Sequence, residues 1–433
     1  MSAVVEAFRA AAAQHQRCFW LDGGGAREWS GRRSLIGVLE PDDVSLTYSA
    51  TTGEVTRHVD GESEVAGTDV FTVLEEELAA GSSRDQWFGY LGYASRPDLP
   101  AAPSVDVPDA VWMRPSHVRL FEHGLPRRNS RSPAQVSAGP KRFTSLPGET
   151  PAAYAAAFQQ VQEHLHAGNS YEVNLTYRLA QASGLDPVSA YLRLRELNPA
   201  PYAGFLQHDV PGAEAWLLSS SPERYALVTR GLDEDGDDDH LTVETKPIKG
   251  TTPRGDDLLS DEEQRQRLAT DPRFRAENLM IVDLLRNDLS MVCEPGTVTV
   301  PTLMEVESYE TVHQLVSTVR GRLRDDVSTV GALRALFPAG SMTGAPKLRT
   351  MQIIDEVEAT PRGAYAGAFG WLAADGRADL GVVIRSLTTT GDGTYRLGTG
   401  GGITVHSEVA DEYAESEWKA ERLQRALSDG ERP

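Results

Sequence analysis

Carboxylates recur at helical spacing in two parts of the chain. Glu412, Glu415 and Lys419 stand at positions i, i+3 and i+7 of a predicted helix, so they share one face of it. Glu277 lies in a second predicted helix, which begins at Asp271 because Asp is a good N-cap. If the two helices meet, they offer the oxygen ligands that magnesium prefers. Exposed Glu–Lys pairs are the commoner result of such spacing, so the pattern alone favours solvated helix faces.

Two further charged residues lie in turn-rich segments. Lys249 stands in PIKGTTPRG, residues 247–255, and Glu223 stands in SPER. A lysine at the surface is a point charge, whereas partial burial lowers its pKa and makes the amine a nucleophile at neutral pH. A glutamate whose surroundings raise its pKa can act as a general acid. The residues by themselves leave both alternatives open.

Two glycine-rich segments could bring backbone amides close to an anion. GSMTGAPK, residues 340–347, leads into a predicted helix, where free amides and the helix dipole favour a negative group. GTGGG, residues 398–402, precedes ITV, which is predicted to be a strand. That order excludes a dinucleotide-binding fingerprint and would instead let amides approach a carboxylate. A tight turn is the simpler interpretation, above all for GTGGG.

The elements that must position these residues alternate irregularly along the chain. Helices are predicted by apolar periodicity and strands by β-branched and aromatic content. The irregular order indicates an α+β fold with antiparallel sheet, not a doubly wound parallel sheet. The main predicted helices are 4–13, 71–78, 152–166 and 409–427, and the main predicted strands are 45–49, 87–93, 366–372 and 381–387.

Composition divides the chain into three parts. Residues 1–121 form a predicted N-terminal subdomain, and residues 122–150, rich in Pro, Ser and Gly, form a predicted linker. Residues 151–427, which contain all the candidate residues named above, form the second predicted domain. The acidic stretch at 232–240 is interpreted as a solvated loop, because it lacks the spacing of a calcium-binding loop.

The charge and cysteine content limit the partners and the compartment. The 42 basic and 63 acidic residues of the 433-residue chain give a net charge of −21, which disfavours nucleic acid and anionic membranes as partners. Cys18 and Cys293 are too few for a disulfide framework, and no apolar run approaches the roughly 20 residues of a membrane helix. We therefore expect a cytoplasmic protein.

From about Pro151 to Leu427 the segments together resemble the chorismate-utilising enzymes. This family includes anthranilate synthase large subunits, aminodeoxychorismate synthase component I, isochorismate synthases and salicylate synthases. The resemblance implies the family's fold, with antiparallel sheets as a central core and helices packed outside. The motifs that carry it, in the family's order, are SSSPER, KPIKGT, AENLMIVDLLRND, VHQLVS, GSMTGAPK, GAYAGAFGW, GVVIRS, GTGGGI and EYAESEWK, with weaker similarity in GRRSLIGVL and WFGYLGY.

The resemblance implies a role for each matching residue. Glu277 and Glu415, supported by Glu412, would bind Mg²⁺, which grips the ring carboxylate of chorismate. Glu223 matches the general acid that helps the 4-hydroxyl group to depart, and His313 matches a pocket histidine that we place with the catalytic residues. The implied contacts with chorismate are Gly250, Thr251, Ser341, Tyr365, Arg385, Gly400, Gly401, Gly402 and Lys419.

Among these residues, Arg385 offers a bidentate fork for the enolpyruvyl carboxylate. One position departs from the family's pattern. Phe274 stands where many relatives have an acidic residue, three positions before the first metal ligand. We therefore expect the surroundings of the metal site to differ there.

Lys249 indicates the aminodeoxychorismate branch of the family, because anthranilate synthases have alanine at this position. In that branch the lysine would attack C2 of chorismate as the hydroxyl at C4 leaves, and ammonia would then displace the lysine by adding at C4. Glu172, in SYEVNLTYR, stands where isochorismate and salicylate synthases have a water-activating lysine. Hydration at C2 is therefore disfavoured.

The implied activity is the Mg²⁺-dependent conversion of chorismate and ammonia into 4-amino-4-deoxychorismate for 4-aminobenzoate synthesis, whether for folate or for a specialised metabolite. Nothing in the chain resembles a glutaminase with its cysteine nucleophile, so ammonia is expected from a separate glutamine amidotransferase subunit. Anthranilate synthase component I is the enzymatic alternative. A chorismate-binding subunit without turnover, which only regulates a partner, is the alternative from another class.

Overall fold

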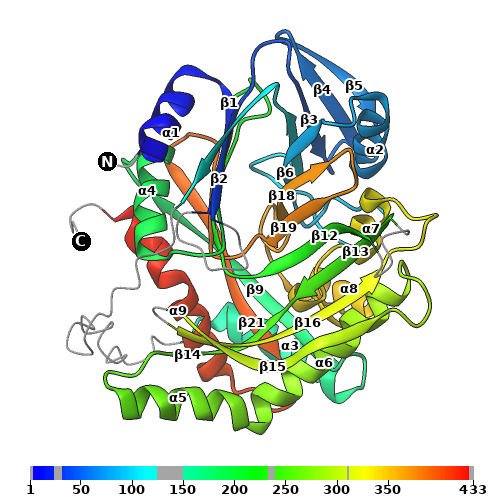
Figure 1. The fold of residues 1–433 in the computed structure, drawn as a ribbon. Helices are drawn as coiled ribbons and strands as arrows, with labels where there is room; N and C mark the ends of the chain where they lie inside the picture. The colour runs from blue at the N-terminus through cyan, green and yellow to red at the C-terminus, as the bar shows by residue number, and fades with distance from the viewer. Residues whose placement is uncertain (1–2, 24–31, 124–149, 233–238, 310–311, 429–433) are drawn as a thin grey trace.

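The structure is a computed structural model that describes residues 3–23, 32–123, 150–232, 239–309 and 312–428. These residues form two antiparallel sheets with helices outside them (Figure 1). The predicted linker, apart from its ends, and residues 233–238 of the acidic stretch lie outside the described residues. None of the described helices is long and apolar enough to cross a membrane.

The first sheet brings together strands from both ends of the chain. In spatial order it contains β17 (Gly344–Ala345), β9 (Glu172–Ala182), β21 (Thr394–Ile403), β20 (Ser386–Thr389), β11 (Ala215–Ser221), β10 (Tyr202–His208), β1 (Arg17–Asp22), β2 (Arg33–Val38) and β8 (His117–Glu122). The pairing of β1 with β10, with Trp20 opposite Phe205, joins the N-terminal part to the rest of this sheet.

The second sheet also combines strands of the N-terminal part with strands from the rest of the chain. In spatial order it contains β14 (Ile248–Pro253), β16 (Val312–Arg322), β13 (Asp239–Lys246), β12 (Arg224–Leu232), β19 (Ala378–Val382), β18 (Ala368–Ala373), β6 (Gln86–Leu91), β7 (Ala110–Arg114), β3 (Val44–Ser49), β4 (Glu54–Val59) and β5 (Glu62–Gly67), and β15 (Thr299–Ser308) pairs with β16. Here β6 pairs with β18, with Gly89 opposite Gly370.

The two sheets pack face to face over a shared apolar layer. Phe19 on β1 stacks on Phe88 on β6, with ring centroids 4.0 Å apart. Leu206 and Leu217 of the first sheet and Phe369 of the second belong to the same buried cluster. Burying side chains of this size contributes about 1.5–3 kcal/mol each, so this layer fixes how the sheets sit together.

Helices cover the outer faces of both sheets. The helices are α1 (Ala3–Gln14), α2 (Val70–Ala80), α3 (Ala152–His166), α4 (Pro187–Leu197), α5 (Leu258–Thr270), α6 (Pro272–Ser290), α7 (Thr329–Leu336), α8 (Lys347–Val357) and α9 (Val409–Leu427). Phe8 of α1, Tyr191 of α4 and Leu423 of α9 share one core with the first sheet. Helices α2, α6 and α7 share another core with the second sheet.

These observations confirm the predicted α+β class with antiparallel sheets inside and helices outside. Asp271 caps α6 by accepting from the backbone amide of Arg273, as its sequence context predicts. Two local predictions are wrong. The single strand expected over 381–387 is broken between β19 and β20, because Arg385 has a φ of 52°. GTGGG does not precede the strand but forms part of β21.

Candidate active site

One cleft collects nearly all the residues that the sequence singles out. Its cavity volume is about 140 Å³, within a wider hollow that opens to solvent. Strands β9, β14 and β21, helices α6 and α9, and the short 3₁₀ turn Gly340–Met342 contribute side chains to it. The predicted residues on its wall are Glu223, Lys249, Gly250, Thr251, Glu277, Ser341, Tyr365, Arg385, Gly400, Gly401, Gly402, Glu412, Glu415 and Lys419.

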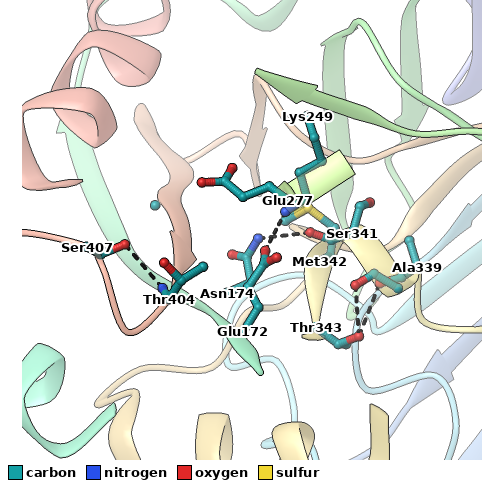
Figure 2. A network of polar contacts seen from close by, with 12 residues as sticks. Glu172, Asn174, Lys249, Glu277, Ala339, Ser341, Met342, Thr343, Thr404 and Ser407 are labelled. Atoms are coloured by element: carbon teal, nitrogen blue, oxygen red, sulfur yellow. Dashed lines mark hydrogen bonds and ion pairs between the residues drawn. The ribbon is translucent and has the colours of Figure 1, made fainter. Parts of the chain in front are cut away.

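Lys249 on β14 is paired with Glu172 at the start of β9. Its Nζ donates to Glu172 Oε1, and the two side chains are 10 % and 1 % exposed (Figure 2). Burial lowers the pKa of Lys249, but the carboxylates of Glu172 and Glu277 outweigh it, so the pKa lies above its usual value. The lowered pKa expected from partial burial is therefore wrong. Attack by this amine requires a nearby group that takes its proton.

Because Gly402 on β21 has no side chain, there is room beside it for the ion pair of Lys249 and Glu172. A Cβ atom there would lie 2.1 Å from Glu172 Oε1 and 3.2 Å from Lys249 Nζ. The strand pairs with β9, with Gly402 opposite Asn174. At this position the glycine run allows β21 to pass close to the buried charges.

Glu223 lies in the turn between β11 and β12, where its carboxyl group is buried. Ser341 Oγ donates to Glu223 Oε1 at 2.6 Å. Burial raises the pKa of Glu223 from 4.5 to about 7, although the Ser341 hydrogen bond and the charge of Lys249 act in the opposite direction. A large fraction of this carboxyl group therefore carries a proton at neutral pH, which suits a general acid.

The three predicted metal ligands reach the same cleft, but cationic side chains hold them. Arg273, in the first turn of α6, binds Glu277 with Nε to Oε1 at 3.1 Å and also binds Glu412 of α9. Lys419 binds Glu415 at 2.9 Å. Across the part of the chain that the structure describes, no group of three or more acidic, histidine or cysteine side chains is arranged to hold a metal ion.

The donor set nevertheless fits a hard cation in its chemistry, because every candidate ligand is a carboxylate. Burial raises the pKa of Glu277 and of Glu412, which means that their charged forms are destabilised. A nearby divalent cation would stabilise both charged carboxylates in place of a proton. In this structure the guanidinium of Arg273 provides a positive charge to these two carboxylates. Sequence reasoning missed Arg273, although its position four residues before Glu277 on one helix face is a recognisable signal.

Arg385 presents a desolvated positive charge to the cleft. Burial lowers its pKa to about 10. Its guanidinium lies 5.7 Å from the ring of Trp418, and no carboxylate among the described residues forms an ion pair with it. A guanidinium without a carboxylate partner in a closed site favours an anionic ligand.

Tyr365 is held from two sides. A Cβ atom at Gly398 would lie 2.3 Å from its ring, so only glycine leaves room for this orientation. Arg178 lies on β9, and its guanidinium is 4.4 Å from the centroid of the Tyr365 ring. Arg178 was not identified from the sequence, since an arginine within a strand carries no distinguishing pattern.

His313 is the predicted site residue that does not line the cleft. Its Nε2 contacts Asp261 Oδ1 at 3.0 Å, and its Nδ1 contacts Ser308 Oγ at 2.8 Å. Its catalytic role stays a prediction. Phe274 lines the cleft, and its ring packs against Gly250, where a Cβ atom would lie 3.1 Å from it.

A comparison with known protein families shows to which family this chain belongs. Residues 16–425 match the family described as chorismate binding enzyme. The chain belongs to this family. It is 39 % identical to an aminodeoxychorismate synthase of Streptomyces pristinaespiralis over 97 % of this chain and 63 % of that protein. It is 42 % identical to aminodeoxychorismate synthase component 1 of Escherichia coli (strain K12) over 63 % of this chain and 57 % of that protein.

A solved structure agrees with this membership. Anthranilate synthase component I from Streptococcus pneumoniae TIGR4 superposes with a TM-score of 0.72 at 26 % identity, covering 91 % of this chain and 92 % of that one. The chain spans about three fifths of the length of the two curated relatives.

Proposed function

We propose that this chorismate-binding family member aminates chorismate at C4 and so acts as component I of an aminodeoxychorismate synthase. The observation that carries the proposal is the buried amine of Lys249, bonded to Glu172 in the same cleft as the protonatable Glu223. The relatives named aminodeoxychorismate synthase support it.

Chorismate carries two carboxylates, and with a bound divalent ion the cleft would present a positive charge to each of them. Arg385 would bind the enolpyruvyl carboxylate through its guanidinium. Glu277 and Glu412, once Arg273 releases them, and Glu415, once Lys419 releases it, would hold Mg²⁺, whose charge would neutralise the ring carboxylate. The bound dianion would thus be fixed at both ends, with its ring between Lys249 and Glu223.

In the first step, Glu172 Oε1 would take a proton from Lys249 Nζ, to which it is already hydrogen-bonded. The amine forms a bond to C2, the ring double bonds shift, and the C4–O bond breaks. Glu223 gives its proton to the departing hydroxyl group, which leaves as water. Ser341, which donates to Glu223 Oε1, would stabilise the resulting carboxylate.

In the second step, ammonia adds at C4 through its lone pair, the double bonds shift back, and the C2–N bond breaks with its electrons returning to Lys249. The Glu223 carboxylate takes one proton from the new ammonium group, and Glu172 returns its proton to Lys249. The sum is chorismate and ammonia giving 4-amino-4-deoxychorismate and water, with both glutamates regenerated.

The ammonia would come from a separate glutamine amidotransferase subunit, and the product would serve 4-aminobenzoate synthesis. The name component 1 of the Escherichia coli relative supports a partner subunit. A reducing cytoplasmic location fits Cys18 and Cys293, which are both free thiols.

The product formed from chorismate, MgCl₂ and an ammonium salt tests the proposal. We expect 4-amino-4-deoxychorismate without pyruvate from the wild-type chain and little product from Lys249→Ala. Anthranilate with stoichiometric pyruvate would instead show the activity named for the Streptococcus pneumoniae neighbour. Binding of chorismate without any product would support a regulatory subunit and overturn the proposal.

A further inference from the structure

Two buried oxygen atoms on β9 have no hydrogen-bond partner among the residues that the structure describes. They are Glu172 Oε2 and Asn174 Oδ1. The residues are 1 % and 7 % exposed, and they stand two positions apart on one strand, so their side chains leave the same face of the sheet. An unsatisfied buried acceptor costs about 1–3 kcal/mol. Two of them together indicate a ligand that donates hydrogen bonds to both.

Hydrogen bonds connect these two residues to both reacting groups, Lys249 and Glu223, and this limits which ligand they could bind. The other oxygen of Glu172 binds Lys249, the amine assigned to C2 of the substrate. Asn174 lines the cleft and donates through Nδ2 to the backbone carbonyl of Ser341 at 3.0 Å. Ser341 in turn holds Glu223, the acid assigned to C4. Figure 2 shows Glu172 and Asn174 side by side below Lys249 and Ser341.

The chemistry of the two oxygens selects a small N–H donor. A carboxylate and an amide oxygen repel the carboxylates of chorismate, and the single O–H of its 4-hydroxyl group could satisfy only one of the two oxygens. Ammonia has three N–H bonds for the two acceptors and keeps its lone pair free. A water molecule could also donate to both oxygens. Water is therefore the alternative occupant that the experiment must distinguish.

We propose that Glu172 and Asn174 form the subsite that holds ammonia beside Lys249 until it adds at C4. Both acceptor oxygens take N–H bonds of the nucleophile, and its lone pair is left to form the C4–N bond. The inference rests on the proposed function, because it concerns the second substrate of that reaction. It adds the residues that bind this substrate, neither of which the family resemblance assigns to it.

The test uses the complete chain with ammonium chloride as the nitrogen source, without a glutaminase. Asn174→Ala removes one acceptor, and the loss of one hydrogen bond predicts an increase of about tenfold in KM for ammonium. The Kd for chorismate should stay near the wild-type value. Asn174→Asp keeps a side-chain oxygen and should restore much of the ammonium KM, whereas a purely structural role for Asn174 predicts equal damage in both variants.

Methylamine gives a second readout that general destabilisation would not change. Asn174→Ala opens space beside the nucleophile, so the ratio of kcat/KM for methylamine to that for ammonia should rise above the wild-type ratio. Asn198→Ala is the matched control, because Asn198 is also a buried asparagine but does not line the cleft. That variant should keep the wild-type KM for ammonium and the wild-type ratio.

The outcomes separate the two proposals. An unchanged ammonium KM and methylamine ratio in Asn174→Ala, with 4-amino-4-deoxychorismate as the product, would show that the oxygens hold water and would overturn the subsite alone. Anthranilate as the wild-type product would overturn the proposed function and the addition at C4, while a raised ammonium KM in Asn174→Ala would still support binding of ammonia at these two oxygens. Absence of any ammonia-dependent product would overturn both.

Discussion

At the scale of single residues, charge balance inside the cleft decides what each group can do. Lys249 and Glu172 are both buried, and either one alone would leave an uncompensated charge in a place with little water. The pairing keeps the lysine protonated at rest, and the same contact gives its proton a place to go. The amine is therefore activated by proton transfer within the pair, not by a lowered pKa of the lysine.

Glu223 should make the stability of the protein depend on pH. Its native pKa of about 7 lies above its ordinary value of 4.5, so the native state binds the proton more tightly and loses stability as pH rises from 4.5 to 7. The full shift corresponds to an upper bound of about 3 kcal/mol. Glu223→Gln should thus gain stability relative to wild type between pH 5 and pH 8, measured by urea unfolding. If the two proteins differ in unfolding free energy by the same amount at pH 5 and at pH 8, Glu223 does not have the raised pKa of a buried acid.

At the scale of elements, the site was predictable where local signals define an element. The cap at Asp271 and the repeated apolar positions predict α6, and the same reasoning predicts α9 with its three facing charged residues. The path of β21 was not predictable in this way. A glycine run has low strand propensity, and its strand conformation depends on the neighbouring β9 and on side chains from distant segments that fill the space above it. Glu172 and Asn174 were missed as binding residues for the same reason, since only the fold shows their unpaired oxygens.

Gly402 should be intolerant of any side chain. The Cβ of Gly402→Ala would overlap Glu172 Oε1, so we expect the ion pair with Lys249 to be displaced and kcat to fall by at least about tenfold. Gly401→Ala is the neighbouring control. Its Cβ would meet Glu412 Oε2 at 3.2 Å and Lys419 Nζ at 3.6 Å, which are ends of flexible side chains. Steady-state kinetics of both variants check the difference, and equal losses would argue against the role of Gly402.

Arg273 links α6 to α9 and should compete with a divalent cation for their carboxylates. Removing it in Arg273→Ala leaves Glu277 and Glu412 without their shared partner. The variant should therefore bind Mg²⁺ more tightly, and MgCl₂ should raise its Tm more than it raises the Tm of wild type. Arg265→Ala, which removes an exposed arginine paired within α5, is the control. A smaller Mg²⁺ response in Arg273→Ala than in wild type would show that Arg273 helps to form the metal site.

At the scale of the whole molecule, the N-terminal part contributes strands to both sheets. Strands β1, β2 and β8 extend the first sheet beyond β10, and β6 and β7 extend the second beyond β18. The sequence divides near 122–150 by composition, but pairing between strands so far apart in the chain leaves no local pattern. The cleft itself is built from elements after Pro151. Its walls nevertheless belong to sheets that the N-terminal strands complete.

Residues 150–433 should therefore not fold alone. Removing the N-terminal strands exposes the edges of β10 and β18 and strips Phe19 and Phe88 from the layer between the sheets. We expect this fragment to lack a cooperative unfolding transition by circular dichroism and to gain one when the 1–149 fragment is added. Cooperative unfolding of the fragment by itself would show that the catalytic part is an independent domain.

A covalent bond between the amine of Lys249 and the substrate is the step on which the proposed reaction depends, and intact-mass spectrometry can detect it. The protein is mixed with chorismate and MgCl₂ in the absence of ammonia and quenched, and the adduct is mapped by peptide analysis. We expect a mass increase equal to chorismate minus one water, located on Lys249, which disappears when ammonium is added before the quench. No adduct, or an adduct on another residue, from a preparation that forms 4-amino-4-deoxychorismate with ammonium would contradict it.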